Sequence, residues 1–120
     1  MQITGAMSEG LARYVDLATQ EAKLTAQNMA NIDTPGYRAM GIDFEGEMRN
    51  ALSGARAAGP AQSPRVRLED GLVSRPDGNN VSMDREGLNL AEAQLKYRTG
   101  LALLRQQYQM TLDAIRVDSK

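Results

Sequence analysis

Two long segments repeat apolar residues at helical spacing, and they restrict the chain to a mainly helical fold. The first segment runs from about residue 6 to 32 and the second from about residue 83 to 117. Steps of three and four residues place these side chains on one stripe of each helix. At about 1.5 Å per residue, the helices would be about 40 Å and about 50 Å long. We therefore expect two long antiparallel helices joined by an irregular middle segment.

The apolar stripes are the predicted packing surfaces. The first contains Met7, Leu11, Tyr14, Ala18, Ala22, Thr25, Met29 and Ile32, and the second Leu90, Ala93, Tyr97, Leu101, Leu104, Tyr108, Leu112 and Ile115. Two helices alone cannot bury both stripes, and monomers rarely expose large apolar patches. The sequence therefore predicts a subunit of an assembly that is partly disordered when isolated. Gly87 and Gly100 each destabilise a helix by about 1 kcal/mol relative to Ala. Each is either a tolerated defect or a point where a neighbouring helix approaches closely.

Composition excludes several classes of function. The chain has 14 basic and 15 acidic residues, one Phe, no Trp, no Cys and no His. Neither charge forms a block, which argues against a nucleic-acid or polybasic membrane surface. No apolar run is long enough for a transmembrane helix, and residues 1–5 lack the features of a cleaved signal peptide. So few large apolar side chains predict a thin core.

The first helical pattern ends abruptly in residues 28–37. Pro35 cannot continue a helix, and Pro35-Gly36 fits the centre of a type II turn with a positive φ at Gly36. Asn28, Asn31 and Asp33 have short polar side chains that can bond nearby backbone groups where the helix ends. We therefore divide the chain into 1–36, a middle segment 37–81, and a C-terminal helix 82–120 that Ser82 caps.

The middle segment has no helical period. Residues 50–64 are rich in Ala, Gly and Pro and are predicted to be a flexible linker. Residues 65–75 alternate around Asp70-Gly71, which predicts a hairpin that pairs Leu68 with Val73. A connection of this length is usually functional or disordered.

Catalytic and metal-binding patterns are scarce. Without His and Cys, the commonest general base and most zinc ligands are missing. Asp43, Glu45 and Glu47 are interpreted as a solvated acidic stretch. Residues 77–80, Asp-Gly-Asn-Asn, fail the spacing of an EF-hand and are interpreted as a turn into the second helix. No catalytic, cofactor-binding or metal-binding residue is predicted, and the chain is not expected to be an enzyme.

The stretch from residue 28 to 37 resembles a motif of the axial proteins of the bacterial flagellum, which include the rod and hook proteins. The pattern is Asn-x-Ala-Asn-x-x-Thr-Pro-Gly-Tyr, with Met29 where Leu or Ile is usual. The small size excludes hook and distal-rod proteins, which have larger middle domains. Residues 42–44, and 77–81 running into 90–97, look most like a proximal rod protein. Residues 50–75 carry no family signal.

This resemblance implies a structural subunit whose terminal helices pack, coiled-coil-like, against neighbouring subunits and transmit torque from the membrane ring to the distal rod and hook. It implies export by the flagellar type III apparatus without a cleaved signal, and a place in the rod in the periplasmic space. Implied partners are copies of the chain, other rod proteins and an adaptor at the membrane ring and export gate. The implied assembly motif consists of Asn28, Ala30, Asn31, Thr34, Pro35, Gly36 and Tyr37.

Two alternatives remain open. One is another small rod protein of the same family, which the C-terminal helix would distinguish. The other belongs to a different class, a stand-alone helical adaptor that binds a partner helix in its stripe. The adaptor would be a compact, cooperatively folded monomer or dimer.

Overall fold

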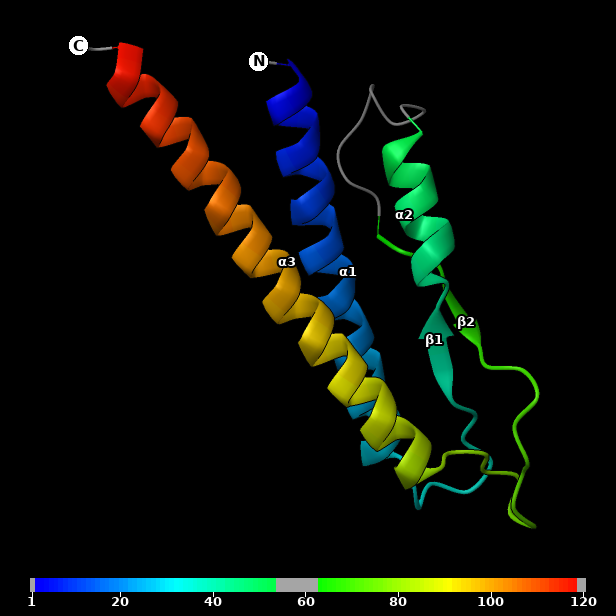
Figure 1. Ribbon diagram of the computed structural model, residues 1–120. Helices are drawn as coiled ribbons and strands as arrows, with labels where there is room; N and C mark the ends of the chain where they lie inside the picture. Colours follow the sequence, from blue (N-terminus) through cyan, green and yellow to red (C-terminus); the bar gives the residue numbers. More distant parts are fainter. Residues whose placement is uncertain (1, 54–62, 119–120) are drawn as a thin grey trace.

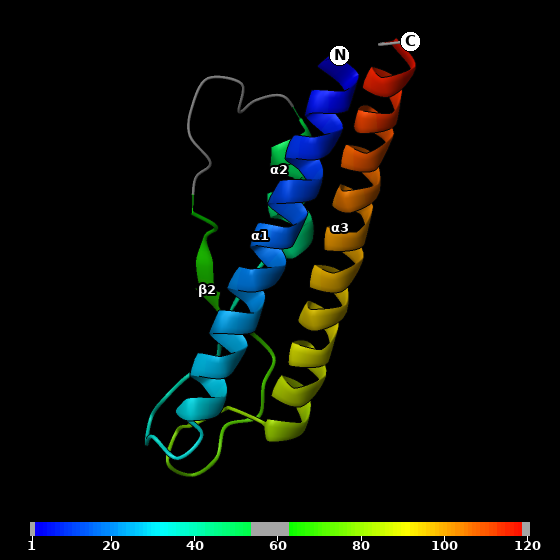
Figure 2. The ribbon, with the colours of Figure 1, turned by 90° about the vertical axis from the view of Figure 1, so that its left-hand side faces the viewer.

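The computed structural model describes residues 2–53 and 63–118 and has the expected mainly helical architecture. The order is α1 (Gln2–Ala30), β1 (Met40–Ile42), α2 (Phe44–Leu52), β2 (Val66–Leu68) and α3 (Met83–Asp118). Helices α1 and α3 lie side by side and antiparallel, so both ends of the chain lie at the same end of the molecule (Figure 1, Figure 2). The molecule measures 70 × 28 × 18 Å.

The tightest packing lies where α1 crosses the first half of α3. Leu17, Ala18 and Ala93 are completely or almost completely buried. A Cβ on Gly100 would lie only 2.8 Å from ring atom Cδ1 of Tyr14, so this glycine is a point of close helix approach. Gly87 has nothing within 4 Å of the same position and is the tolerated defect. Close helix approach therefore explains Gly100, and a tolerated defect explains Gly87.

Helix α2 was not anticipated from the sequence, and its start corrects the interpretation of the acidic stretch. Asp43 is the N-cap, because its carboxylate accepts the N–H of Gly46 at 3.2 Å. Glu47 is only 15% exposed and lies 3.5 Å from a guanidinium nitrogen of Arg13 on α1. Asp43 therefore begins α2, and Glu47 holds α2 against α1.

Aromatic contacts also fasten α2. Phe44 meets the ring of Tyr14 edge to face, with ring centroids 5.1 Å apart. The ammonium group of Lys96 on α3 lies 4.0 Å from the centroid of Phe44 and 3.0 Å from a carboxylate oxygen of Glu21. This one cluster therefore joins all three helices. Of the predicted linker, residues 50–52 are the end of α2, and residues 54–62 lie outside the described residues.

The predicted hairpin is wrong. Strand β2 pairs antiparallel with β1, with Leu68 opposite Met40 and Val66 opposite Ile42. Val73, the predicted partner of Leu68, is 90% exposed and lies outside any strand. An isolated two-stranded hairpin is marginally stable in water. Pairing with β1 instead places β2 in a sheet that packs on α1, because β1 contacts that helix.

Candidate functional site at the joint

Residues 28–37 and 75–81 meet at the end of α1, and we call these two segments together the joint. The first segment forms the predicted type II turn. The N–H of Tyr37 donates to the carbonyl of Thr34 at 3.2 Å, and Gly36 has φ of +76°. Pro35 and Gly36 occupy the central positions of this turn. The direction in which the chain leaves α1 is therefore fixed by a residue that tolerates positive φ.

Asn31 behaves as predicted for a residue at a helix end. Its Nδ2 donates to the carbonyl of Gln27 at 2.8 Å, and its Oδ1 accepts the hydroxyl of Thr34 at 3.0 Å. Both bonds are local, within four residues of Asn31. They stiffen the last turn of α1 as the chain enters the turn.

Asn28 does something different from the predicted local bonding, because its buried amide ties α1 to β1 and α3. Its Oδ1 accepts the N–H of Met40 at 3.0 Å and the hydroxyl of Tyr37 at 3.2 Å. Its Nδ2 donates to the carbonyl of Met40 at 2.9 Å and to Oε2 of Glu86 at 3.1 Å. The amide of Asn28 thus bonds both backbone groups of Met40, as a neighbouring strand would.

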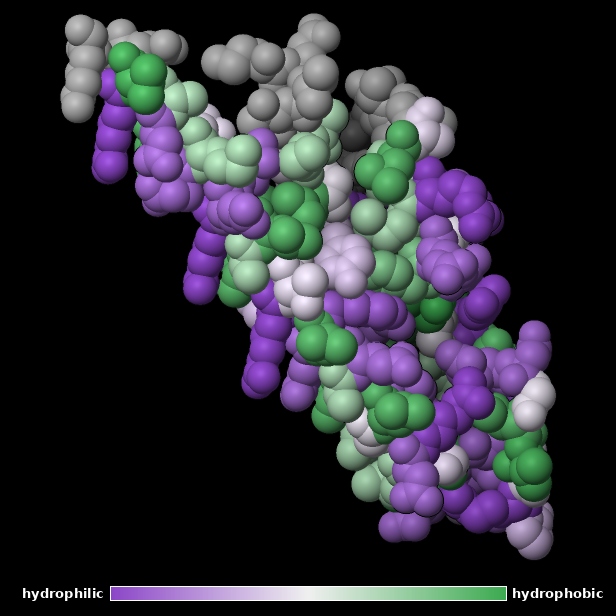
Figure 3. Space-filling view, in the orientation of Figure 1, coloured by the Kyte–Doolittle hydropathy of each residue, from purple (hydrophilic) through white to green (hydrophobic). Residues whose placement is uncertain are grey.

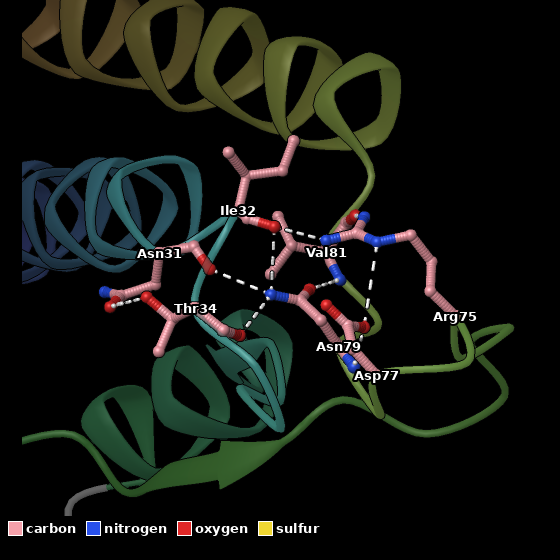
Figure 4. A network of polar contacts seen from close by, with 7 residues as sticks. All are labelled: Asn31, Ile32, Thr34, Arg75, Asp77, Asn79 and Val81. Carbon is pink, nitrogen blue, oxygen red and sulfur yellow. Dashed lines mark hydrogen bonds and ion pairs between the residues drawn. The ribbon is translucent and has the colours of Figure 1, made fainter.

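Asn79 ties down the turn that follows α1 from far along the chain. Its side chain is completely buried and points into the turn formed by residues 31–34 (Figure 4). Its Nδ2 lies within hydrogen-bonding distance of three carbonyl oxygens, those of Asn31 (2.9 Å), Ile32 (3.0 Å) and Thr34 (2.8 Å). Its Oδ1 accepts the N–H of Val81 at 2.8 Å. The turn that follows α1 is therefore held by a residue 45 to 48 positions away.

Backbone bonds join the two segments of the joint directly. The N–H of Gly36 donates to the carbonyl of Asp77 at 2.9 Å, and the N–H of Asn80 donates to the carbonyl of Tyr37 at 3.3 Å. The side-chain Oδ1 of Asn80 accepts the N–H of Ala39 at 2.6 Å. The beginning and the end of the middle segment are thereby tied together.

Arg75 and Gly78 complete the joint. The guanidinium of Arg75 donates to the carbonyl of Val81 at 2.8 Å and also to the carbonyl of Ile32. Gly78 has φ of +86°, and a Cβ there would lie 3.4 Å from Cα of Gly36. Two glycines with positive φ therefore let the two segments approach closely. The local pattern of residues 77–80 predicted a turn, and the resemblance to a rod protein also included this segment. Neither predicted that Asn79 bonds the turn after α1, for which its short polar side chain was the available signal.

Glu86 is the buried acid of this region. It is 1% exposed and accepts the hydrogen bond from Asn28. Burial raises the pKa of Glu86, and the charge of Glu69 adds to the rise, while the bond from Asn28 and the charge of Arg85 lower it. A carboxyl group in this position holds a proton more readily than an exposed one.

The predicted assembly residues divide into buried and exposed sets. Asn28 is buried, Asn31 and Tyr37 are half-buried, and Ala30, Thr34, Pro35 and Gly36 are exposed. Among the predicted packing residues, Ala18, Thr25 and Ala93 are buried. The half-buried ones are Leu11, Tyr14, Ala22, Met29, Ile32, Leu90, Leu101 and Leu104, and the exposed ones are Met7, Tyr97, Tyr108, Leu112 and Ile115. The two helices thus leave much of both stripes uncovered, most of all in the second half of α3.

Within residues 2–53 and 63–118, no group of three or more acidic side chains could hold a metal ion. In that part of the chain, no helix is long and apolar enough to cross a membrane.

Comparisons with known proteins agree on one family. No family model matches the chain. The flagellar basal body rod protein FlgB of Salmonella typhimurium is 38% identical over 111 residues, covering 78% of this chain and 80% of that protein. FlgB of Yersinia enterocolitica is 35% identical over 75% of this chain and 79% of its own length. FlgB of Cereibacter sphaeroides is 34% identical over 88% and 90%. The chain belongs to the FlgB family of flagellar basal-body rod proteins.

Proposed function

We propose that the chain is a structural subunit of the proximal rod of the flagellar basal body and polymerises through α1 and α3. The observation that carries this proposal is the uncovered apolar stripe, since Tyr97, Tyr108 and Leu112 remain exposed although α1 and α3 are already packed together. An extended molecule with an incomplete helix pair buries this surface only against neighbouring helices. The neighbours are copies of the chain and other rod proteins.

The remaining parts of the proposal follow from the family. The subunit leaves the cell interior through the flagellar type III apparatus, lies in the rod within the periplasmic space, and meets an adaptor protein at the membrane ring. Its assembled helices transmit torque from that ring to the distal rod and hook. The joint sets the angle at which the middle segment leaves the helix pair toward a neighbouring subunit.

The proposal is tested by deleting the gene for the chain in its own host and purifying basal bodies from the complemented strain. We expect loss of swimming on deletion, and the chain in purified basal bodies after complementation. A swimming deletion strain, or a complemented strain whose purified basal bodies lack the chain, contradicts the proposal.

The role of the joint is tested at Gly36, whose φ of +76° suits Gly and is tolerated by Asn. Nothing lies within 4 Å of a Cβ there, so a substitution acts through backbone strain and not through a clash. Gly36→Val should abolish incorporation into basal bodies while the chain still reaches the culture medium, and Gly36→Asn should retain incorporation. Normal incorporation of Gly36→Val would show that this turn is not needed for assembly.

A further inference from the structure

An apolar groove lies at the end of the molecule opposite the joint, between α1, α2 and α3. It has a volume of about 650 Å³ and is lined by Met7, Gly10, Tyr14, Met48, Leu52 and Leu103, among others. Leu52 is 67% exposed and stands at its rim. On the face shown in Figure 3, green hydrophobic side chains lie between the upper parts of the three helices, while purple side chains are mixed among them nearer the joint. The groove is open, and the described residues that line it are almost entirely apolar.

The second half of α3 carries an apolar surface that stays exposed among the residues that the structure describes. Tyr108 is 57%, Leu112 50% and Ile115 57% exposed. They recur at i, i+4 and i+7, which is the spacing of side chains that anchor a helix in a groove. At 100° per residue, Tyr108 points about 140° away from Leu103, and Leu103 faces the groove. One helix therefore cannot turn both surfaces toward its own groove.

We infer that the groove of one copy receives the Tyr108, Leu112 and Ile115 face of α3 from a second copy. This rests on the proposed function and names the surfaces that two subunits use. Other exposed apolar pairs on α3, Leu88 with Leu95 and Met110 with Val117, are seven residues apart and have no large exposed apolar side chain on the same face between them. The face near the end of α3 provides three large anchors within two turns and fits the groove better.

The area of this contact is that of a weak, repeating interface. The groove side exposes Met7, Leu52 and Leu103, and the donor side exposes Tyr108, Leu112 and Ile115. Together these six side chains have on the order of 500 Å² of accessible apolar surface, or about 250 Å² on each copy. A stable dimer buries about 800 Å² on each partner, so this contact alone does not hold a dimer in dilute solution. The groove and the donor face are different surfaces, so the contact can repeat from copy to copy and gives a ring or an open helical polymer.

The absence of Cys from the chain allows a direct test by disulfide cross-linking. Leu52→Cys places a thiol at the rim of the groove, and Leu112→Cys places one on the donor face. Leu95→Cys is the matched control, because Leu95 is 66% exposed on the same helix. Equimolar pairs of full-length variants are mixed, oxidised, and mapped by mass spectrometry. Circular dichroism first checks that each variant keeps the helix content of the original chain.

We expect a disulfide between positions 52 and 112 to form at least roughly tenfold faster than one between 52 and 95, because docked copies hold the two thiols at millimolar effective concentration. The same bond should form in purified basal bodies from a strain that produces both variants. The inference is overturned if 52 links equally fast to 95, if 52 links preferentially to 52, or if purified basal bodies that contain both variants lack the bond between 52 and 112. In each of these cases the chain can still be present in basal bodies, so the proposed function is judged separately.

Discussion

The side chain of Asn79 holds the turn through which the chain leaves α1. The last carbonyls of α1 accept the backbone N–H groups of Asn31 and Ile32. Pro35 in the following turn has no N–H to offer. The amide of Asn79 reaches the carbonyls of Asn31, Ile32 and Thr34 from the opposite side of the joint. The end of α1 is thereby made dependent on the end of the middle segment.

Asn79→Ala should lower the free energy of unfolding by roughly 2 to 3 kcal/mol, because it removes the hydrogen bonds of a completely buried amide and leaves the buried N–H of Val81 without a partner. Asn79→Asp should be at least as harmful, since a carboxylate cannot donate to carbonyl oxygens. Asn50→Ala, at an exposed position on α2, should change stability by less than about 0.5 kcal/mol. Urea unfolding followed by circular dichroism measures all three. Equal midpoints for the substitutions at 79 and 50 would show that the amide of Asn79 is dispensable.

Glu86 gives the stability of the protein a pH dependence whose sign follows from its raised pKa. The folded state binds this proton more tightly than the unfolded state, so the contribution is fully present below the ordinary value of 4.5 and is lost as pH rises through the raised value. Glu86→Gln keeps an acceptor for Asn28 and removes the charge. The variant should therefore match the original chain near pH 4 and exceed its stability at pH 7.

The measurement for Glu86 is thermal unfolding of both proteins between pH 4 and pH 8. Glu92→Gln is the control, because Glu92 is exposed on the same helix and should show no such crossover. A stability difference between Glu86→Gln and the original chain that stays constant with pH would contradict the assignment.

At this scale the sequence predicted the local chemistry and missed the distant partners. The positive φ of Gly36 and the local bonds of Asn31 follow from residues within a few positions. The four bonds of Asn28 and the reach of Asn79 depend on which segments meet in space. A single sequence does not show which distant segments lie together. Asn28 was therefore expected to bond only nearby backbone groups at the end of its own helix.

At the scale of the elements, two glycines of α3 show how closely α1 and α3 must approach each other. Substituting each by Ala compares a crowded position with an open one. Gly100→Ala should destabilise the chain by about 1 to 3 kcal/mol, because the new methyl group overlaps Tyr14 and Val15. Gly87→Ala has open space and should stabilise α3 by up to about 1 kcal/mol. The opposite signs are checked by urea unfolding of both variants. Two stabilising substitutions would mean that α1 and α3 are not in close contact at Gly100.

The long helices could be predicted, and the short elements could not. Residues 6–32 and 83–117 were expected to be helical, and the structure has Gln2–Ala30 and Met83–Asp118, since many periodic residues support each assignment. Helix α2 is nine residues long and shows too few apolar repeats to stand out. The Asp70-Gly71 signal predicted a local hairpin, but β1 offered β2 a partner already held by α1. Tertiary contacts override turn preference where strands are this short.

The whole molecule is unevenly packed along its length. Its radius of gyration is 18.3 Å, against about 14 Å for a compact domain of this size. Most of the buried residues, among them Leu17, Asn79 and Glu86, lie at the joint or in the half of the helix pair next to it, while Tyr108, Leu112 and Ile115 lie exposed near the other end. The two halves of the helix pair therefore differ in the stabilisation that they receive from burial.

In dilute solution we therefore expect a monomer with less helix than α1 and α3 contain, frayed at the end opposite the joint and gaining helix on assembly. Amide hydrogen exchange should be slow from about residue 17 to 28 and from 79 to 100, and fast beyond residue 104. Sedimentation and circular dichroism at increasing protein concentration measure whether the monomer assembles and gains helix together. A compact, fully helical monomer with one sharp melting transition would contradict the prediction that the chain completes its folding by assembly.

The backbone bonds between Gly36 and Asp77 and between Tyr37 and Asn80 make residues 38–76 a closed loop with both ends fastened at one place. The entropy cost of closing such a loop grows only logarithmically, by about 0.6 kcal/mol for each doubling of its length. Insertions in the connections between β1, α2 and β2 therefore change the stability of the helix pair very little, because they leave both fastening points where they are. The connections can differ in length, whereas Phe44 and Glu47, which contact α1, must keep their places against the helix pair.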